Sequence, residues 1–478
     1  MSESLVWVIL RTLLSFWWFI IFLPLFLLLQ NSLLAWRQKR FENETNWVLL
    51  EIVIPREIKK SPLAMEQVLT AINSLRNSPT TPLEYYWDGE ITRPFSLEMI
   101  SLGGEVHFYV RVYSKLRDLV EAAFYSYYPD IELIEIDDYI DRFPINIKEM
   151  YQQGYDIWGT ELLQAKDGCY PIKTYKHFES PDENKQFDPI SNFLEVLAKA
   201  KKEELVGVQI IITPLESKWS DQFKDLVSKL KESSVGKGKK SSSPGYSTQI
   251  DFPGPGFPLP IFTAVKGGEK EESSFTSFVA RTPGETNTLE AIEENMGKEA
   301  FETIIRVCYL SPKQIFFDSY ARRGLMGAFN QYGTTDLNKF TLNPRVNTRA
   351  LVWFFPYLFP DRRTEYRKQR LLYNFRNRET PPNTLMGKVM SSYLFNFNTA
   401  SKPIILTTQC LATIFHPPTF VVLTAPHMKR IESRKAGPPA GLAIYGSEED
   451  LEKFTPPQDI VVEDSENNSD LLEEDSNA

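Results

Sequence analysis

A long apolar segment near the N-terminus is the feature that most constrains this chain. Seventeen uncharged, mostly apolar residues run from Leu13 to Leu29, and after a short polar break Leu33 and Leu34 extend the segment. As a helix rising 1.5 Å per residue, the stretch to Leu34 spans roughly 33 Å, which matches the hydrocarbon core of a bilayer. A secretory signal has a basic start and a shorter apolar run, so we predict a membrane anchor over residues 1–40.

Charged residues beside the apolar segment predict its orientation. Arg37, Lys39 and Arg40 follow it closely, whereas Arg11 is the only basic residue before it. Basic residues favour the cytoplasmic side of a membrane. Trp36 is expected at the membrane–water interface, where tryptophan is enriched. We therefore predict a single-pass protein of the inner (cytoplasmic) membrane, with the bulk of the chain in the cytoplasm.

The net charge of −9 comes from the C-terminal end of the chain. From Gly446 onward there are 12 Asp or Glu residues and one Lys, so the rest of the chain has 50 acidic and 52 basic residues. We predict that residues 446–478 form a disordered acidic tail. The three cysteines form no CxxC or CxxH motif, which argues against a disulfide framework or a zinc site and favours a reducing compartment.

Residues 41–143 have the pattern of a ferredoxin-like module within an α+β fold. Buried strands alternate with amphipathic helices, and Gly103-Gly104 marks a hairpin turn. The resulting order is β-α-β-β-α-β, the split βαβ arrangement. The expected elements are a strand at 46–57, a helix at 61–77, two strands within 95–112, a helix at 114–130 and a strand at 131–139.

Residues 144–445 are predicted to form a second, related α+β domain. A strand, a Ser-Pro pair and a helix follow one another within 301–332, as they do in the first module, and this indicates an internal duplication. A segment rich in Gly, Ser, Pro and Lys predicts a flexible insertion at 233–274. The other expected elements are strands at 168–179 and 205–215, and helices at 190–204 and 220–234.

The residue types that support catalysis are not arranged for it. "GKGKKSSS" lacks the spacing of a phosphate-binding loop and has no strand before it. None of the four histidines stands at metal-ligand spacing from another. Cys410 and His416 are six residues apart and would point to different faces of a helix. We therefore expect a protein that is not an enzyme, with no catalytic residue, no metal site and no cofactor.

Basic and aromatic residues are interleaved between Arg345 and Arg378. Such a surface could hold the phosphates of nucleic acid, anionic lipid head groups or an acidic partner. The alternative is an amphipathic helix with a solvated basic side and a buried aromatic side. The candidate anion- or partner-binding residues are Arg345, Arg349, Arg362, Arg363, Arg367, Lys368 and Arg370.

The segment "TTQCLATIFHPP" (Thr407–Pro418), followed by "GPPAGLAIYG" (Gly437–Gly446), resembles a recurring block in one family. These are membrane-anchored proteins with a domain of unknown function, from type IV secretion and conjugative DNA-transfer systems of small-genome, candidate-phylum bacteria. The resemblance extends back through "YYPDIELIEIDDY" (Tyr127–Tyr139) and the segment 301–332. It covers most of residues 47–446 and brings no known catalytic residue.

This chain departs from the family pattern in two ways. Cys410 stands where the family favours an acidic residue, and no phosphate-binding loop follows Gly446, where an ATPase domain often follows in the family. The resemblance therefore implies a scaffold or adaptor for a separately encoded secretion ATPase and other membrane-complex subunits, either as a monomer or as an oligomer. It also makes one segment a packing corner or docking edge, formed by Leu411, Ala412, His416, Pro417 and Pro418.

Overall fold

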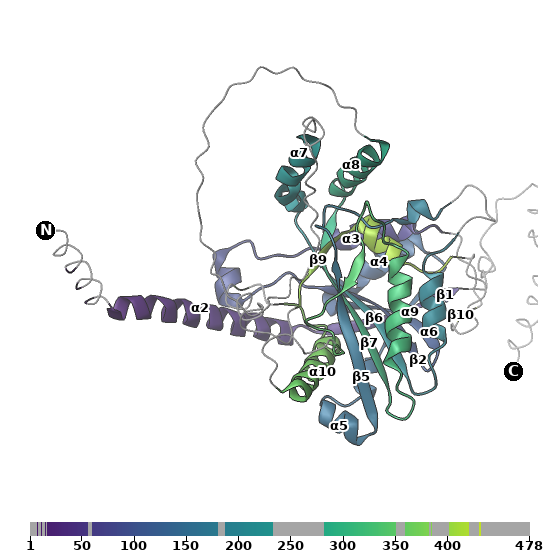
Figure 1. Ribbon diagram of the computed structural model, residues 1–478, viewed down its shortest axis with the longest axis horizontal. Coiled ribbons are helices and arrows are strands. Elements are labelled where there is room, and N and C mark those ends of the chain that lie inside the picture. The colour runs from purple at the N-terminus through teal and green to yellow at the C-terminus, as the bar shows by residue number, and fades with distance from the viewer. Residues whose placement is uncertain are drawn as a thin grey trace, which may run out of the picture. The chain divides into compact units, whose positions relative to one another are not determined.

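A large, mainly antiparallel β-sheet forms the centre of the protein in a computed structural model (Figure 1). The fold is mixed, with helices on both faces of the sheet, so the predicted α+β class is confirmed at this level. The structure describes Trp7, Arg11, Ser15, Thr384 and residues 17–55, 60–179, 187–232, 282–349, 359–381, 401–419 and 430–431.

The first half of the sheet follows the predicted order of elements. In this half β1 pairs antiparallel with both β3 and β4, and β2 pairs antiparallel with β3, which gives the strand order β4-β1-β3-β2. Gly103 and Gly104 have positive φ angles, as the tight turn of this hairpin requires. The elements are β1 (Trp47–Pro55), α3 (Leu63–Ser74), β2 (Phe95–Leu102), β3 (Glu105–Tyr113), α4 (Arg117–Tyr127) and β4 (Glu132–Ile136).

The second half repeats this arrangement with the strand order β8-β5-β7-β6. The two halves join where β2 pairs antiparallel with β6, so the two predicted domains share one continuous sheet. The elements are β5 (Tyr155–Gln164), α6 (Ser191–Ala198), β6 (Leu205–Pro214), β7 (Ala300–Pro312), α9 (Asp318–Asn330) and β8 (Phe340–Leu342).

Further elements cover the sheet or extend its edges. Strand β9 pairs with β7, and β10 pairs parallel with β1. The further elements are α2 (Trp17–Glu44), η1 (Glu84–Asp88), η2 (Ser114–Leu116), η3 (Tyr139–Arg142), α5 (Ile147–Gln152), η4 (Tyr175–His177), η6 (Ser217–Phe223), α7 (Lys224–Glu232), α8 (Pro283–Met296), α10 (Pro360–Asn377), β9 (Ile404–Thr407), α12 (Thr408–Ile414) and β10 (Arg430–Ile431).

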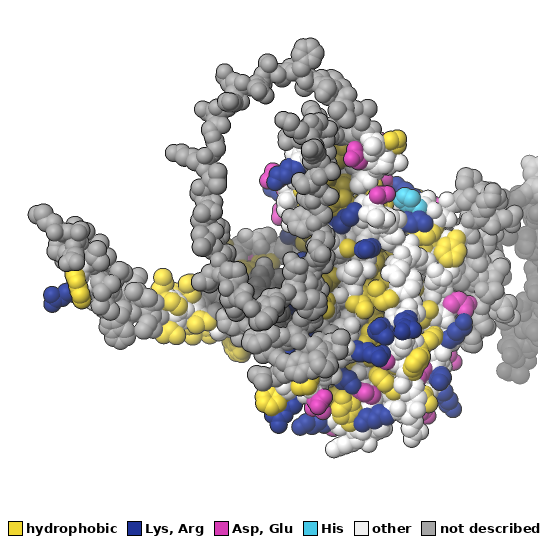
Figure 2. All heavy atoms as spheres, viewed as in Figure 1, with side chains coloured by type: hydrophobic (Ala, Val, Ile, Leu, Met, Phe, Trp, Pro, Cys, Tyr) yellow, Lys and Arg dark blue, Asp and Glu magenta, His cyan; other side chains and the backbone are white. Residues whose placement is uncertain are grey.

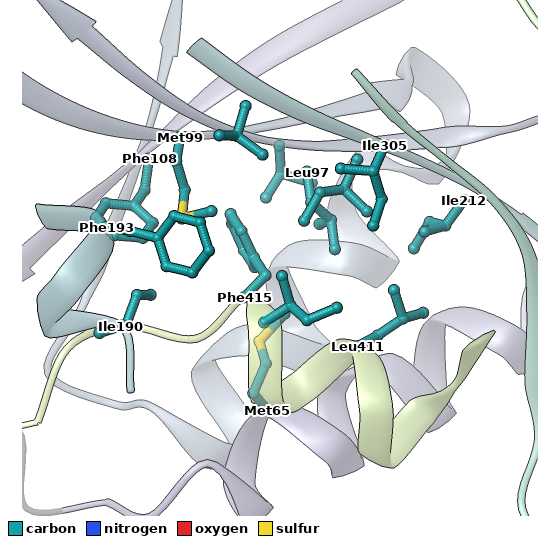
Figure 3. Close-up of a cluster of buried hydrophobic side chains, with 14 of the residues drawn as sticks. Met65, Leu97, Met99, Phe108, Ile190, Phe193, Ile212, Ile305, Leu411 and Phe415 are labelled. Atoms are coloured by element: carbon teal, nitrogen blue, oxygen red, sulfur yellow. The ribbon is translucent and has the colours of Figure 1, made fainter. Parts of the chain in front are cut away.

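Alternate residues of each strand divide the core into two layers. Helices α3, α4, α6, α9 and α12 pack on one face, where the rings of Phe108 in β3 and Phe415 lie 5.7 Å apart (Figure 3). Elements α5, η3 and α10 cover the other face, where Leu371 and Phe375 contribute to a second buried cluster. Figure 1 shows α5 and α10 on the side of the sheet away from α6 and α9. This second face also carries the buried charges described below.

The prediction of a strand at 168–179 is wrong, and strand β5 was not predicted. Residues 168–179 form a loop with a short 3-10 turn, held by Lys173, whose N–H donates to the carbonyl of Tyr332. The sequence of this segment resembles that of a strand because apolar residues that prove to be buried, such as Cys169 and Ile172, recur along it. Strand β5 was missed because its buried residues include Glu161, which breaks the apolar pattern.

The two halves correspond strand by strand in a different way from the one that the Ser-Pro pairs indicate. Those pairs follow β1 at Ser61-Pro62 and end β7 at Ser311-Pro312. By order along the chain, β7 corresponds to β3 and not to β1, because both are the third strand of their half. The repeat of elements therefore rests on the strand pairing and not on the motif.

Three predicted segments lie wholly or partly outside the described residues. They are the start of the span Leu13–Leu34, the insertion at 233–274 and the tail at 446–478. Within the part of the chain that the structure describes, no helix combines the length and apolarity needed to cross a membrane.

Candidate functional site at the base of helix α2

Helix α2 is clamped to the turn η1 by one arginine. The Nη1 atom of Arg37 donates hydrogen bonds to the carbonyls of Tyr86 and Trp87, at 3.1 and 2.9 Å, and its guanidinium lies 4.2 Å from the centre of the Trp87 ring. Gly89 makes this approach feasible, since a Cβ there would lie 2.6 Å from the backbone of Arg37 and its φ is +69°. The clamp therefore holds the helix and the turn as one piece.

A second set of contacts ties the end of α2 to the segment after α10. The Lys39 ammonium lies 2.9 Å from the carboxylate of Glu42 and 2.8 Å from that of Glu379. Burial lowers the pKa of Lys39, but the two carboxylates raise it on balance, so the ammonium stays charged. Leu34 and Gln38 are buried at the same junction. The helix thus enters the folded unit without a flexible linker.

The surface of α2 beyond this junction is apolar. Figure 2 shows hydrophobic side chains along the part of the helix that extends from the sheet. In globular helices such residues are buried along one stripe, whereas here they are exposed around the helix. The exposed large side chains are Phe22, Leu23, Leu25, Phe26, Leu27, Leu28, Leu29, Leu33 and Trp36.

A polar cleft of about 440 Å³ lies between the end of α2, strands β1 and β3, η3 and α10. The acidic residues that line it each have a basic partner. Glu42 pairs with Lys39, Asp141 pairs with Arg376 at 2.6 Å, and Asp138 pairs with Arg378.

Arg111 is the exception among the charged groups of this cleft. Its guanidinium stacks 4.4 Å from the centre of the Trp47 ring and forms no hydrogen bond or ion pair with the described residues. Burial lowers its pKa to about 10, which leaves the group charged at neutral pH. The cleft therefore contains a cation whose N–H donors bind no group among the described residues.

A buried network of charges lies under the C-terminal end of α10. The Glu98 carboxylate in β2 accepts hydrogen bonds from Ser96, Tyr139, Gln209 and Arg378. Burial raises the pKa of Glu98, but the Arg378 charge and these hydrogen bonds lower it on balance. The carboxylate therefore stays ionised inside the protein.

A second buried pair lies within the second half of the sheet. The Nε of Arg306 in β7 lies 2.9 Å from the Glu161 carboxylate in β5, and its Nη1 donates to the carbonyl of Asn374 at 3.0 Å. In the sheet, Glu98 is the partner of Gln209, and Gln209 is the partner of Arg306. One polar row thus crosses the centre of the sheet and holds the end of α10.

The predicted basic cluster does not form one exposed surface. Arg367 is buried and donates hydrogen bonds to the backbone carbonyls of Pro344 and Asn347, so it provides donors for the loop that contains these two residues. The remaining positions differ in exposure and partners. Lys368 pairs with Asp156 and Arg349 with Asp318, Arg345 and Arg363 are half-buried, and Arg362 and Arg370 are exposed beside the Phe359 and Tyr373 rings.

The segment predicted to be either a packing corner or a docking edge lies inside the core. Its five residues Leu411, Ala412, His416, Pro417 and Pro418 are all buried, so they are packing residues and present no edge to a partner. His416 lies 2.9 Å from a carboxylate oxygen of Asp188 and 2.8 Å from the carbonyl of Ala412. Both ring nitrogens therefore face acceptors, which suits a charged imidazolium paired with Asp188.

The three cysteines belong neither to the cleft nor to the buried charge networks. All three are buried free thiols, and burial raises the pKa of each, to about 11 for Cys169. Cys410 contacts Asn295 at 3.7 Å, while His416 faces Asp188, so the structure does not pair the two residues as a nucleophile and base. No group of ligands suited to a metal ion occurs among the described residues.

Sequence analysis named Arg37 and Lys39 only for their charge beside the apolar segment, and it did not single out Glu98, Arg306 or Arg111. Glu98 and Arg306 each interrupt an otherwise apolar strand, and a charge at a core position is a recognisable sign of a buried pair. The sequence carries no comparable sign of the role of Arg111 or of the contact between Arg37 and Trp87. The partners of both arginines lie in other elements.

Comparison with known proteins gives one match. Residues 32–353 match a family described as a domain of unknown function (DUF8128). The match begins within α2 and ends after β8, so it includes the clamp, both halves of the sheet and the Glu161–Arg306 pair, but neither α10 nor Arg378. No curated protein matches the sequence. Because the match covers more than half of the chain, the protein belongs to the DUF8128 family.

Proposed function

We propose that this protein is a non-enzymatic, membrane-anchored scaffold or adaptor of a type IV secretion or conjugative DNA-transfer machinery. The observation that carries the anchoring is the junction of α2. An exposed apolar helix enters the folded unit directly, where Arg37 and Lys39 fix it. Helices that are apolar all round are buried either in a protein core or in a membrane, and a rigid junction would transmit the orientation of α2 to the sheet.

The proposed orientation places the N-terminus outside and the folded unit in the cytoplasm of the inner membrane. Arg37, Lys39 and Arg40 support it through their position at the end of the apolar stretch. A C-terminal reporter that is active only in the cytoplasm should give a signal, and a reporter active only in the periplasm should give none. The reverse pattern would refute the orientation.

We further propose that each half of the sheet is a ferredoxin-like unit. The order β-α-β-β-α-β in both halves and the matching strand orders support this description. Two such units joined through β2 and β6 present a broad, rigid body, which suits a scaffold better than a mobile enzyme domain.

The secretion context rests on the sequence resemblance of the segments 127–139, 301–332 and 407–418. The test uses the full chain reconstituted in a bilayer and a purified secretion ATPase from the same organism. We expect the chain alone to hydrolyse no ATP and to retain the ATPase on the bilayer. ATP hydrolysis by the chain alone would refute the non-enzymatic assignment, and failure to retain the ATPase would refute the adaptor role.

We propose a second, narrower candidate function, which is the binding of an anionic group at Arg111. The guanidinium donors, which bind none of the described residues, and the adjoining Trp47 ring favour it. The cleft is therefore a better candidate for anion binding than the cluster Arg345–Arg370. Several side chains of that cluster already bind intramolecular partners. Binding to nucleic acid or anionic lipid head groups through that cluster would rest on Arg362 and Arg370.

A further inference from the structure

Four large exposed side chains lie on α2 and at η1, the two elements that Arg37 joins, and we call them the aromatic collar: Trp36, Leu83, Tyr86 and Trp87. Their exposed fractions are 60%, 66%, 51% and 66%. Trp36 precedes Arg37 in α2, and Arg37 binds the backbone of Tyr86 and Trp87. One contact thus brings an exposed helix residue and an exposed turn together.

The turn is built to present these side chains. η1 is a π-helical turn, a rare conformation that is often found at functional positions. The Tyr85 and Tyr86 rings meet edge to face at 4.9 Å, which orders the turn, and Gly89 ends it in the left-handed conformation. Soluble proteins seldom leave such large apolar groups together on the surface unless something covers them.

We propose that the aromatic collar lies in the interfacial layer of the lipid bilayer and fixes the folded unit against the membrane surface. The collar continues the exposed apolar surface of α2, since Trp36 is three residues, or about 4.5 Å along the helix, from Leu33. Trp and Tyr concentrate at the head-group level of membranes, because their rings are apolar and their N–H and O–H groups are polar. The collar has the same chemistry.

This inference rests on the proposed anchoring of α2, and its consequence is specific. The folded unit would touch the membrane at two elements, α2 and η1, instead of one. Because the clamp couples these elements, the sheet could not rotate freely about the helix.

The test uses the full chain with Leu83→Cys, labelled with an environment-sensitive fluorophore and reconstituted in vesicles of phosphatidylcholine and phosphatidylglycerol. The native cysteines Cys169, Cys308 and Cys410 are buried and leave the added thiol as the reactive one. The matched control is Phe317→Cys, which replaces an apolar residue of similar exposure, 63%, before α9. Lipids that carry a quencher near the head group report contact.

We expect the fluorescence of the label at 83 to be quenched at least about twice as strongly as that of the label at 317. An interfacial position lies within reach of the quencher. Extraction of the vesicles at alkaline pH tests the anchor separately. If the protein stays in the vesicles but both labels are quenched equally, or neither is, the collar is refuted and the anchor stands. If alkaline extraction releases the protein, the proposed anchoring fails, and the collar inference fails with it.

Discussion

Arg378 and Glu98 lie 280 residues apart in the chain and form a buried ion pair with a distance of 2.9 Å between Nε and Oε1. Arg378 ends α10 in the left-handed conformation, with a φ of 53°, which few residues other than glycine adopt. The pair therefore outweighs a local backbone cost. It ties the end of α10 to β2, at the seam between the two halves of the sheet.

Replacing Arg378 by Met should destabilise the protein by about 3–5 kcal/mol, because the Glu98 carboxylate would remain buried without its counter-charge. The midpoint of urea unfolding of the purified chain measures the change. The matched control is Arg362→Met in the same helix, which is exposed and should change stability by less than about 0.5 kcal/mol. Equal effects of the two substitutions would contradict the buried-pair interpretation.

The double substitution Arg378→Met with Glu98→Gln separates the charge from the packing. It removes both ionised groups, so part of the loss should be recovered relative to Arg378→Met alone. A double variant as unstable as the sum of the two single variants would show that the two residues act independently.

Gly89→Ala should loosen the junction of α2 with η1. The added Cβ meets the Arg37 backbone, and the left-handed conformation costs a non-glycine residue about 1–2 kcal/mol. Hydrogen exchange of the amides at 84–90 should quicken. Gly284→Ala in α8 is the control, since nothing lies within 4 Å of its added Cβ and alanine favours helices. Unchanged exchange at 84–90 would argue against the clamp.

The first half of the fold could be predicted because each of its elements carries its own local pattern. Strand β1 is a continuous apolar run, and Gly103-Gly104 supplies the turn between β2 and β3. Strand β5 could not be found in this way. Its core positions include Glu161, whose burial becomes favourable only through Arg306, more than 100 residues away.

The candidate site was harder to predict than the fold, since a list of basic residues does not show which of them are buried. Arg367 and Lys368 are adjacent in sequence, yet one caps carbonyls inside the protein and the other pairs with Asp156. In the same way, the sequence left open whether His416 and its neighbours form a packing corner or a docking edge, and the position of Asp188 shows a buried pair.

Asp188 makes stability depend on acid pH. Burial raises the pKa of its carboxyl, but the charge and hydrogen bonds of His416, with the hydrogen bonds of Thr419, lower it to about 2, below its ordinary value of 3.8. A lowered pKa contributes stability above the unfolded value, and that contribution is lost as the pH falls toward 2. The shift corresponds to about 2 kcal/mol.

Asp188→Asn tests this prediction, because asparagine resembles the protonated acid. Wild type should be more stable than the variant by about 2 kcal/mol between pH 5 and 7, and the difference should shrink between pH 4 and 2. Urea unfolding at each pH gives the comparison. A difference that stays constant from pH 7 to 2 would show that the carboxylate charge does not contribute.

Arg111→Gln tests the cleft as an anion site. If the guanidinium binds a phosphate group, the substitution should weaken the binding of inorganic phosphate to the detergent-solubilised chain by about tenfold or more, because a charge-assisted hydrogen bond is lost. Titration calorimetry measures the affinity. Arg362→Gln removes an exposed arginine that does not line the cleft, and it should bind phosphate as wild type does. Equal affinities in all three proteins, or no saturable binding to wild type, would exclude Arg111 as the binding group.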